Sequence, residues 1–64
     1  MNNMILNGNV VYYAVKVNGM ILEHKYSDKT YAENIKFQVQ REQGPAALVE
    51  VVPVTADGKE LLLG

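Results

Sequence analysis

The chain has no cysteine, no tryptophan and a single histidine among its 64 residues. Without cysteine, neither a disulfide nor a thiolate metal site can form. With one histidine, His24, a zinc site built from several histidines of one chain is excluded as well. We therefore expect no metal and no cofactor. A chain this short then has to rely on a well-packed small core, on oligomerisation, or on both.

An excess of basic charge is also lacking. Seven acidic and six basic residues give a net charge of −1, so the broad positive field that nucleic-acid binding draws on is missing. No apolar run approaches the length of a membrane span. The N-terminal residues lack the basic and apolar regions of a secretory signal, so a cytoplasmic location is expected.

Residues 1–9 contain four asparagines and one glycine, a composition that favours turns over regular elements. We expect residues 1–9 to form a flexible N-terminal tail and residues 10–64 to form a single domain. Two alternatives stay open at this point. Residues 4–6 form a short extra strand, or Met4 is the true start of the protein.

A β-hairpin is predicted over residues 10–26, with Asn18-Gly19 as its turn. Asn-Gly favours a type I′ turn, which needs positive φ at both central residues. Because side chains alternate along a strand, the hairpin has two faces. One face is apolar or aromatic apart from a histidine, and its facing pairs are Val17–Met20, Val15–Leu22, Tyr13–His24 and Val11–Tyr26. The other carries the charges and consists of Val10, Tyr12, Ala14, Lys16, Ile21, Glu23 and Lys25.

A helix is predicted over residues 29–43, which contain no glycine or proline. Ser27 or Asp28 supplies the N-cap, and Gly44-Pro45 ends the helix. The stripe that should face the sheet consists of the apolar residues Tyr31, Ala32, Ile35 and Val39, and either Gln38 or Glu42 could extend it. Phe37 lies off this stripe, so it either reaches round the edge of the sheet or is exposed.

Two further strands are predicted, over residues 48–54 and residues 59–63, with Pro53 marking an edge or a bulge. Their connection is either a two-residue Asp57-Gly58 loop or a longer loop with Gly58 in the left-handed conformation. The element order is then β-β-α-β-β. It indicates an α+β two-layer sandwich with a mainly antiparallel sheet and one helix packed on one face. The helix should cover the first face of the hairpin.

No residue pattern predicts catalysis. The acidic residues are spread singly, and the glycines lie in turns instead of in a phosphate-binding loop. His24 has no serine, cysteine or carboxylate at a recognisable spacing, so a structural role is predicted for it. We expect a protein that is not an enzyme.

The sheet face away from the helix is the candidate interface. Tyrosine is enriched at binding hot spots, and Tyr12 lies on this face among other apolar residues. The last two strands are apolar on both faces and extend the same surface. The predicted interface residues are Val10, Tyr12, Ala14, Ile21, Val52 and Val54. Phe37, if exposed, forms a second contact surface beside Lys36, Gln40 and Arg41.

Residues 12–19 (Tyr-Tyr-Ala-Val-Lys-Val-Asn-Gly) and residues 51–64 resemble small uncharacterised open reading frames of phages and other bacterial mobile elements. The resemblance covers about half of the chain. It implies a protein that acts by binding a host protein and not by catalysis, and it assigns no functional residues.

The function predicted from these observations is a small non-enzymatic interaction protein, a homodimer that binds through its sheet surface or through an open strand edge. The alternative is a small nucleic-acid-binding protein. It would use the basic residues Lys16, Lys25, Lys29, Lys36 and Arg41. Acidic residues interleaved with these basic ones disfavour the alternative.

Overall fold

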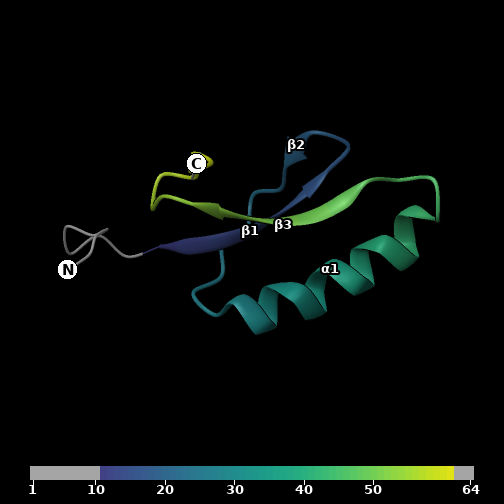
Figure 1. The fold of residues 1–64 in the computed structure, drawn as a ribbon, viewed down its shortest axis with the longest axis horizontal. Coiled ribbons are helices and arrows are strands. Elements are labelled where there is room, and N and C mark those ends of the chain that lie inside the picture. The colour runs from purple at the N-terminus through teal and green to yellow at the C-terminus, as the bar shows by residue number, and fades with distance from the viewer. Residues whose placement is uncertain (1–10, 62–64) are drawn as a thin grey trace.

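The computed structural model describes residues 11–61. It contains the strands β1 (Tyr12–Val17), β2 (Met20–Ile21) and β3 (Val49–Val54), and the helix α1 (Lys29–Gln43). The strands form an antiparallel sheet in the order β2-β1-β3, and α1 packs against it (Figure 1). The predicted α+β fold with one helix on one face of the sheet is confirmed. The predicted tail 1–9, the alternative strand 4–6 and Val10 lie outside the described residues.

The turn between β1 and β2 has the predicted conformation. The φ angles of Asn18 and Gly19 are 49° and 85°, and positive values at both positions define a type I′ turn. Val17 pairs with Met20, as the register from this turn requires. The Asn18 side chain also accepts a hydrogen bond from the Leu48 N–H at 2.9 Å, so the turn is tied to the start of β3.

Farther from the turn, the hairpin departs from the predicted register. The Leu22 N–H still donates to the Val15 carbonyl at 2.8 Å, but Tyr13 then exchanges both backbone hydrogen bonds with Tyr26, at 2.7 and 2.8 Å. The predicted pairs Tyr13–His24 and Val11–Tyr26 are therefore wrong. Residues 23–25 are consecutive polar residues, all exposed, and they bulge out of the ladder so that Tyr26 can enter it.

The ends of α1 follow from its capping residues. The Asp28 carboxylate accepts a hydrogen bond from the Thr30 N–H at 3.1 Å, which satisfies one of the free donors of the first turn. At the other end, Gly44 has a φ of 96°, and its N–H donates to the Gln40 carbonyl at 2.9 Å. Of the two predicted N-caps, Asp28 is the one used.

Contacts of α1 identify the face of the sheet that it covers. The ring of Tyr31 in α1 lies 5.3 Å from that of Tyr26, in an edge arrangement. Tyr26 pairs with Tyr13, and paired residues of an antiparallel ladder share a face. The helix therefore covers the Tyr13 side, where Val15 is buried, and Ala32 of α1 is buried too. Within residues 11–61, α1 contacts β1 and β3 but not β2.

The predicted last strand is reduced, among the described residues, to a bridge between Val54 and Glu60. The Thr55 N–H donates to the Lys59 carbonyl at 2.8 Å, which closes a loop over residues 56–58. Gly58 has a φ of 87°, so the longer of the two predicted loops is the one that forms. Residues 62 and 63 of the predicted strand lie outside the described part of the chain.

Pro53 lies where its missing N–H costs no hydrogen bond to β1. It faces Tyr13, whose own backbone groups both point away from β3, toward Tyr26. The ring nitrogen of Pro53 therefore points to the outer edge of the sheet. The Pro53 carbonyl, on that same edge, accepts from the Leu61 N–H at 2.9 Å.

Candidate functional site

The sheet face predicted to be an interface is a second small core. Ala14, Val52 and Val54 are buried together, with 0%, 6% and 0% of their surface exposed, and the half-buried Tyr12 and Ile21 pack against them. These residues alternate with those under α1, so they lie on the opposite face. The expectation that this face is uncovered is therefore wrong for the three buried valine and alanine residues. Val10 lies outside the described residues.

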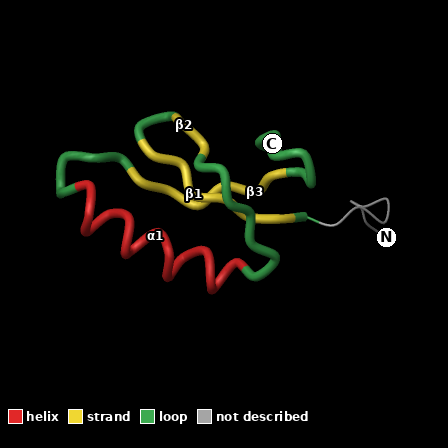
Figure 2. Tube along the Cα trace, turned by 180° about the vertical axis from the view of Figure 1, so that it is seen from behind, coloured by secondary structure: helices red, strands yellow, loops and turns green. Residues whose placement is uncertain are grey.

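Residues 55–61 turn back along the outer edge of β3, where the Leu61 N–H donates to the Pro53 carbonyl and Glu60 pairs with Val54. Figures 1 and 2 show them across the β1–β3 pair from α1. Glu60 shares the face of Val54, its bridge partner, and its carboxylate accepts a hydrogen bond from the Lys16 ammonium at 2.9 Å. This hydrogen bond, together with the negative charges of Glu60 and Glu50, raises the pKa of Lys16 above its ordinary value. Burial opposes the shift but does not cancel it.

The predicted basic set is not gathered on one surface. Lys16 lies on the sheet face away from α1 and forms an ion pair with Glu60. Lys36 lies on α1, with its ammonium 3.3 Å from the Glu33 carboxylate. Two of the five basic residues therefore have carboxylate neighbours. His24 is exposed in the bulge of residues 23–25, so it does not face Tyr13 as predicted.

Metal and membrane sites find no support in the described part of the chain. Residues 11–61 hold no group of three or more histidine, aspartate or glutamate side chains arranged to bind a metal ion. Over the same range, no helix combines the length and the apolar character that crossing a bilayer requires.

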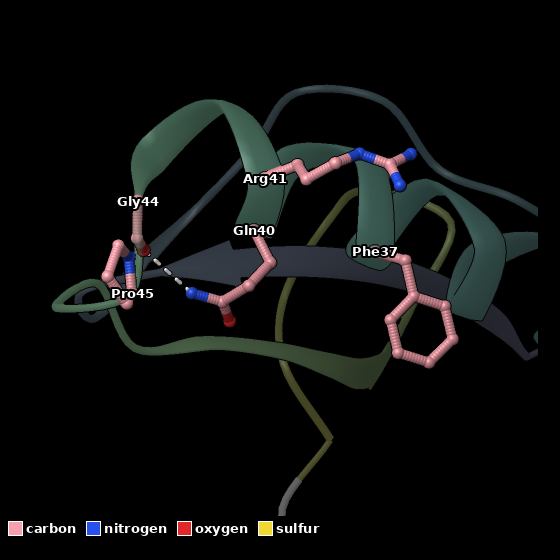
Figure 3. Close-up of a pocket in the computed structure, with 5 residues that line it drawn as sticks. All are labelled: Phe37, Gln40, Arg41, Gly44 and Pro45. Carbon is pink, nitrogen blue, oxygen red and sulfur yellow. Dashed lines mark hydrogen bonds between the residues drawn. The ribbon is translucent and has the colours of Figure 1, made fainter.

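An open hollow of about 500 Å³ lies at the C-terminal end of α1 (Figure 3). Phe37, Gln40, Arg41, Gly44 and Pro45 line it. Phe37 is 57% exposed, so of the two positions predicted for it the exposed one is correct, and its side chain does not reach round into the core. The Lys36 ammonium lies 4.6 Å from the centre of the ring, within range of a cation–π contact.

The Gln40 amide gives the hollow its shape. Its nitrogen donates to the Gly44 carbonyl at 2.9 Å and to the Ala47 carbonyl at 3.0 Å, which fixes the path from the end of α1 to the start of β3. In Figure 3 the Phe37 ring and the Gln40 amide point to the same side of the helix, and Arg41 runs along the helix toward Phe37. Phe37 and Arg41 are four residues apart and so are neighbours on the helix surface.

A second apolar area lies on β2 and next to it. Met20 is 69% exposed and Leu22 is 36% exposed, because α1 does not extend over β2. Tyr31, at the end of the helix that contacts Tyr26, is 53% exposed. Sequence reasoning placed Leu22 under the helix, and the exposure of this area follows from the helix covering β1 and β3 alone.

Sequence reasoning identified Phe37, Gln40 and Arg41 as neighbours on α1 but missed the hollow. The walls supplied by Gly44 and Pro45 depend on the two hydrogen bonds of Gln40, which no local pattern indicates. Comparison of the chain with protein-family models, with curated proteins and with solved structures returns no match.

Proposed function

We propose that this chain is a small non-enzymatic protein-interaction module. It works as a homodimer and binds its partner through the hollow around Phe37. The observation that carries the proposal is an aromatic residue, Phe37, that is 57% exposed and lines a concave surface together with Arg41 and Pro45. Aromatic residues and arginine are enriched at the centres of protein interfaces, where they contribute most of the binding energy.

The rigidity of the hollow supports the proposal. Both amide hydrogens of Gln40 are used within the chain, and the ring of Pro45 restricts the backbone that follows Gly44. Association loses less entropy when the binding surface is already ordered. A partner side chain that enters this hollow therefore meets walls that need little rearrangement.

The partner that we propose is a host protein in the bacterial cytoplasm. This part of the proposal draws on the resemblance of residues 12–19 and residues 51–64 to open reading frames of phages and mobile elements. It makes the chain an accessory protein of such an element.

Nucleic-acid binding has less support as a function. Glu60 and Glu33 lie beside Lys16 and Lys36, so these cations offer less charge to phosphates than their number implies. Fluorescence anisotropy with labelled DNA and RNA at low salt tests this alternative, and salt-dependent binding would favour it over the interaction module.

The proposed function is tested by capture from a lysate of the bacterial host, followed by a binding measurement with the purified partner. Wild type is compared with Phe37→Ser, and Leu48→Ser serves as the matched control. Leu48 is an equally exposed apolar residue, at 63%, and does not line the hollow. We expect one partner that binds wild type and Leu48→Ser and that binds Phe37→Ser at least about tenfold more weakly. Equal affinity for all three proteins would reject the hollow as the binding site.

A further inference from the structure

The strand β2 has an apolar side that nothing in residues 11–61 covers. Met20 pairs with Val17, and Leu22 is bonded to Val15, so both side chains point to the face on which α1 lies. The helix nevertheless does not contact β2, and Met20 is 69% exposed. These two side chains form a strip beside α1, here named the β2 strip.

The same strand has an open backbone edge. The backbone groups of Met20 and Leu22 point toward β1, as the Leu22 N–H to Val15 carbonyl bond of 2.8 Å shows. Because backbone groups alternate in direction along a strand, the N–H and C=O of Ile21 point outward. Among the described residues, they have no hydrogen-bond partner. An edge of this kind is a template for another strand.

We propose that two copies of this chain associate through β2, antiparallel, with Ile21 on the two-fold axis. This inference rests on the dimer in the proposed function and names the surface that forms it. In this arrangement each Ile21 exchanges two backbone hydrogen bonds with the Ile21 of the second copy. The three-stranded sheets then join into one sheet of six strands, with both helices on the same face.

Self-complementarity identifies a second copy as the occupant. With Ile21 on the axis, Met20 of one copy faces Leu22 of the other, and the reverse pair is identical by symmetry. Four apolar side chains therefore meet between the two α1 helices. The next pair outward places Gly19 opposite Glu23, so no like charges face each other across the junction.

The other edge of the sheet is a poorer template. On β3, Pro53 occupies an outward position and has no N–H to donate, and its carbonyl is already bonded to Leu61. Antiparallel pairing of β3 about a central Glu50 would also place two carboxylates opposite each other. The edge of β2 has neither of these obstacles to pairing with another strand.

The small size of the β2 strip limits the expected affinity between the two copies. Two side chains from each copy and a short strand bury less than the roughly 1,200 Å² of a stable interface. We therefore expect a reversible dimer with a dissociation constant of roughly 10–100 µM. Sedimentation equilibrium over concentrations from about 1 µM to about 1 mM covers this range.

The first part of the test compares wild type with Met20→Lys and with Leu48→Lys in that experiment. Both residues are largely exposed, so neither substitution should unfold the chain, and circular dichroism checks this. Met20→Lys should weaken association at least about tenfold, because it buries two charges in the junction. Leu48→Lys should leave association unchanged.

The second part tests the register with introduced cysteines, since the chain has none of its own. A mixture of Met20→Cys and Leu22→Cys should form a mixed disulfide under mild oxidation, because facing Cα atoms of such a pair lie about 4.5 Å apart. Met20→Cys alone places its thiols on Cα atoms more than about 7 Å apart and should cross-link poorly. Leu48→Cys is the control for random collision.

The outcomes separate this inference from the proposed function. A dimer in which the mixed pair cross-links no better than Leu48→Cys would overturn pairing through β2 and leave a homodimer in place. A monomer at about 1 mM would overturn both the pairing and the dimer. Partner binding through Phe37 is measured independently of either result.

Discussion

The Lys16 ammonium and the Glu60 carboxylate, 44 positions apart in the chain, lie 2.9 Å from each other on the face of the sheet opposite α1. The contact joins the central strand β1 to residues 55–61, which are hydrogen-bonded along the outer edge of β3. It therefore holds the C-terminal part of the described chain to the middle of the sheet by an ion pair.

Removal of this ion pair should have an effect that depends on pH. The Glu60 hydrogen bond raises the pKa of Lys16 above its ordinary value of 10.5. A raised pKa means that the contact stabilises the fold below pH 10.5 and that this stabilisation is lost as the pH rises through the folded-state pKa. Glu60→Gln should lower the melting temperature at neutral pH. The difference in melting temperature between this variant and wild type should become smaller in strongly alkaline solution. A difference that stays constant across the alkaline range would contradict the contact.

Truncation of Val54 should be costly, because it lies in the second core with no exposed surface. Val54→Ala removes two methyl groups from a closed site, and we expect a loss of about 2 kcal/mol in the free energy of unfolding. Phe37→Ser, at an exposed position, should change it by only about 0.5 kcal/mol. Urea denaturation of both variants measures the contrast. Similar small losses of stability in the two variants would mean that Val54 is not enclosed as the structure shows.

Substitution of Gly19 tests the turn of the hairpin. Its φ of 85° is one that side-chain-bearing residues rarely adopt, although a Cβ atom there would meet no neighbour within 4 Å. Gly19→Ala should therefore destabilise the chain by about 1–2 kcal/mol through backbone conformation alone. Denaturant unfolding gives this value. Gly19→Asn is the control. Asparagine tolerates positive φ, so this variant should be destabilised less than Gly19→Ala.

Loss of the Gln40 amide should affect the hollow more than the fold. Gln40→Leu keeps the size of the side chain but removes both hydrogen bonds to the Gly44 and Ala47 carbonyls. We expect a loss of about 1–2 kcal/mol in stability. Hydrogen exchange of the Ala47 amide should become faster, because the loop is no longer held. Unchanged exchange in this variant would show that other contacts fix the loop.

Local chemistry was enough to predict most of the elements. Asn18-Gly19 predicts the turn because few other residue pairs accept positive φ at both positions. Asp28 and Gly44 predict the limits of α1 because one supplies a cap oxygen and the other ends the helix in a conformation that glycine favours. These features depend on residues close together in the sequence.

Features that depend on distant residues were predicted less well. The pairing of Tyr13 with Tyr26 instead of His24 requires a bulge in the hairpin. The contact between Tyr26 and Tyr31 offsets the free energy that this bulge costs. Burial of Ala14 depends on Ile21 of β2 and Val52 and Val54 of β3, which reach it only once the sheet has formed. Alternation of side chains assigns residues to two faces, but it does not say how much of each face another segment will cover.

The outward position of Pro53 has a consequence for how far assembly can proceed. A flat sheet with two usable edges adds copies without end and grows into fibres. Here one edge carries a proline and a bonded Leu61, while the proposed pairing through β2 would occupy the other edge in both copies. Under that proposal growth would stop at two copies, and replacing Pro53 by a residue with an N–H would remove one of the barriers to polymerisation.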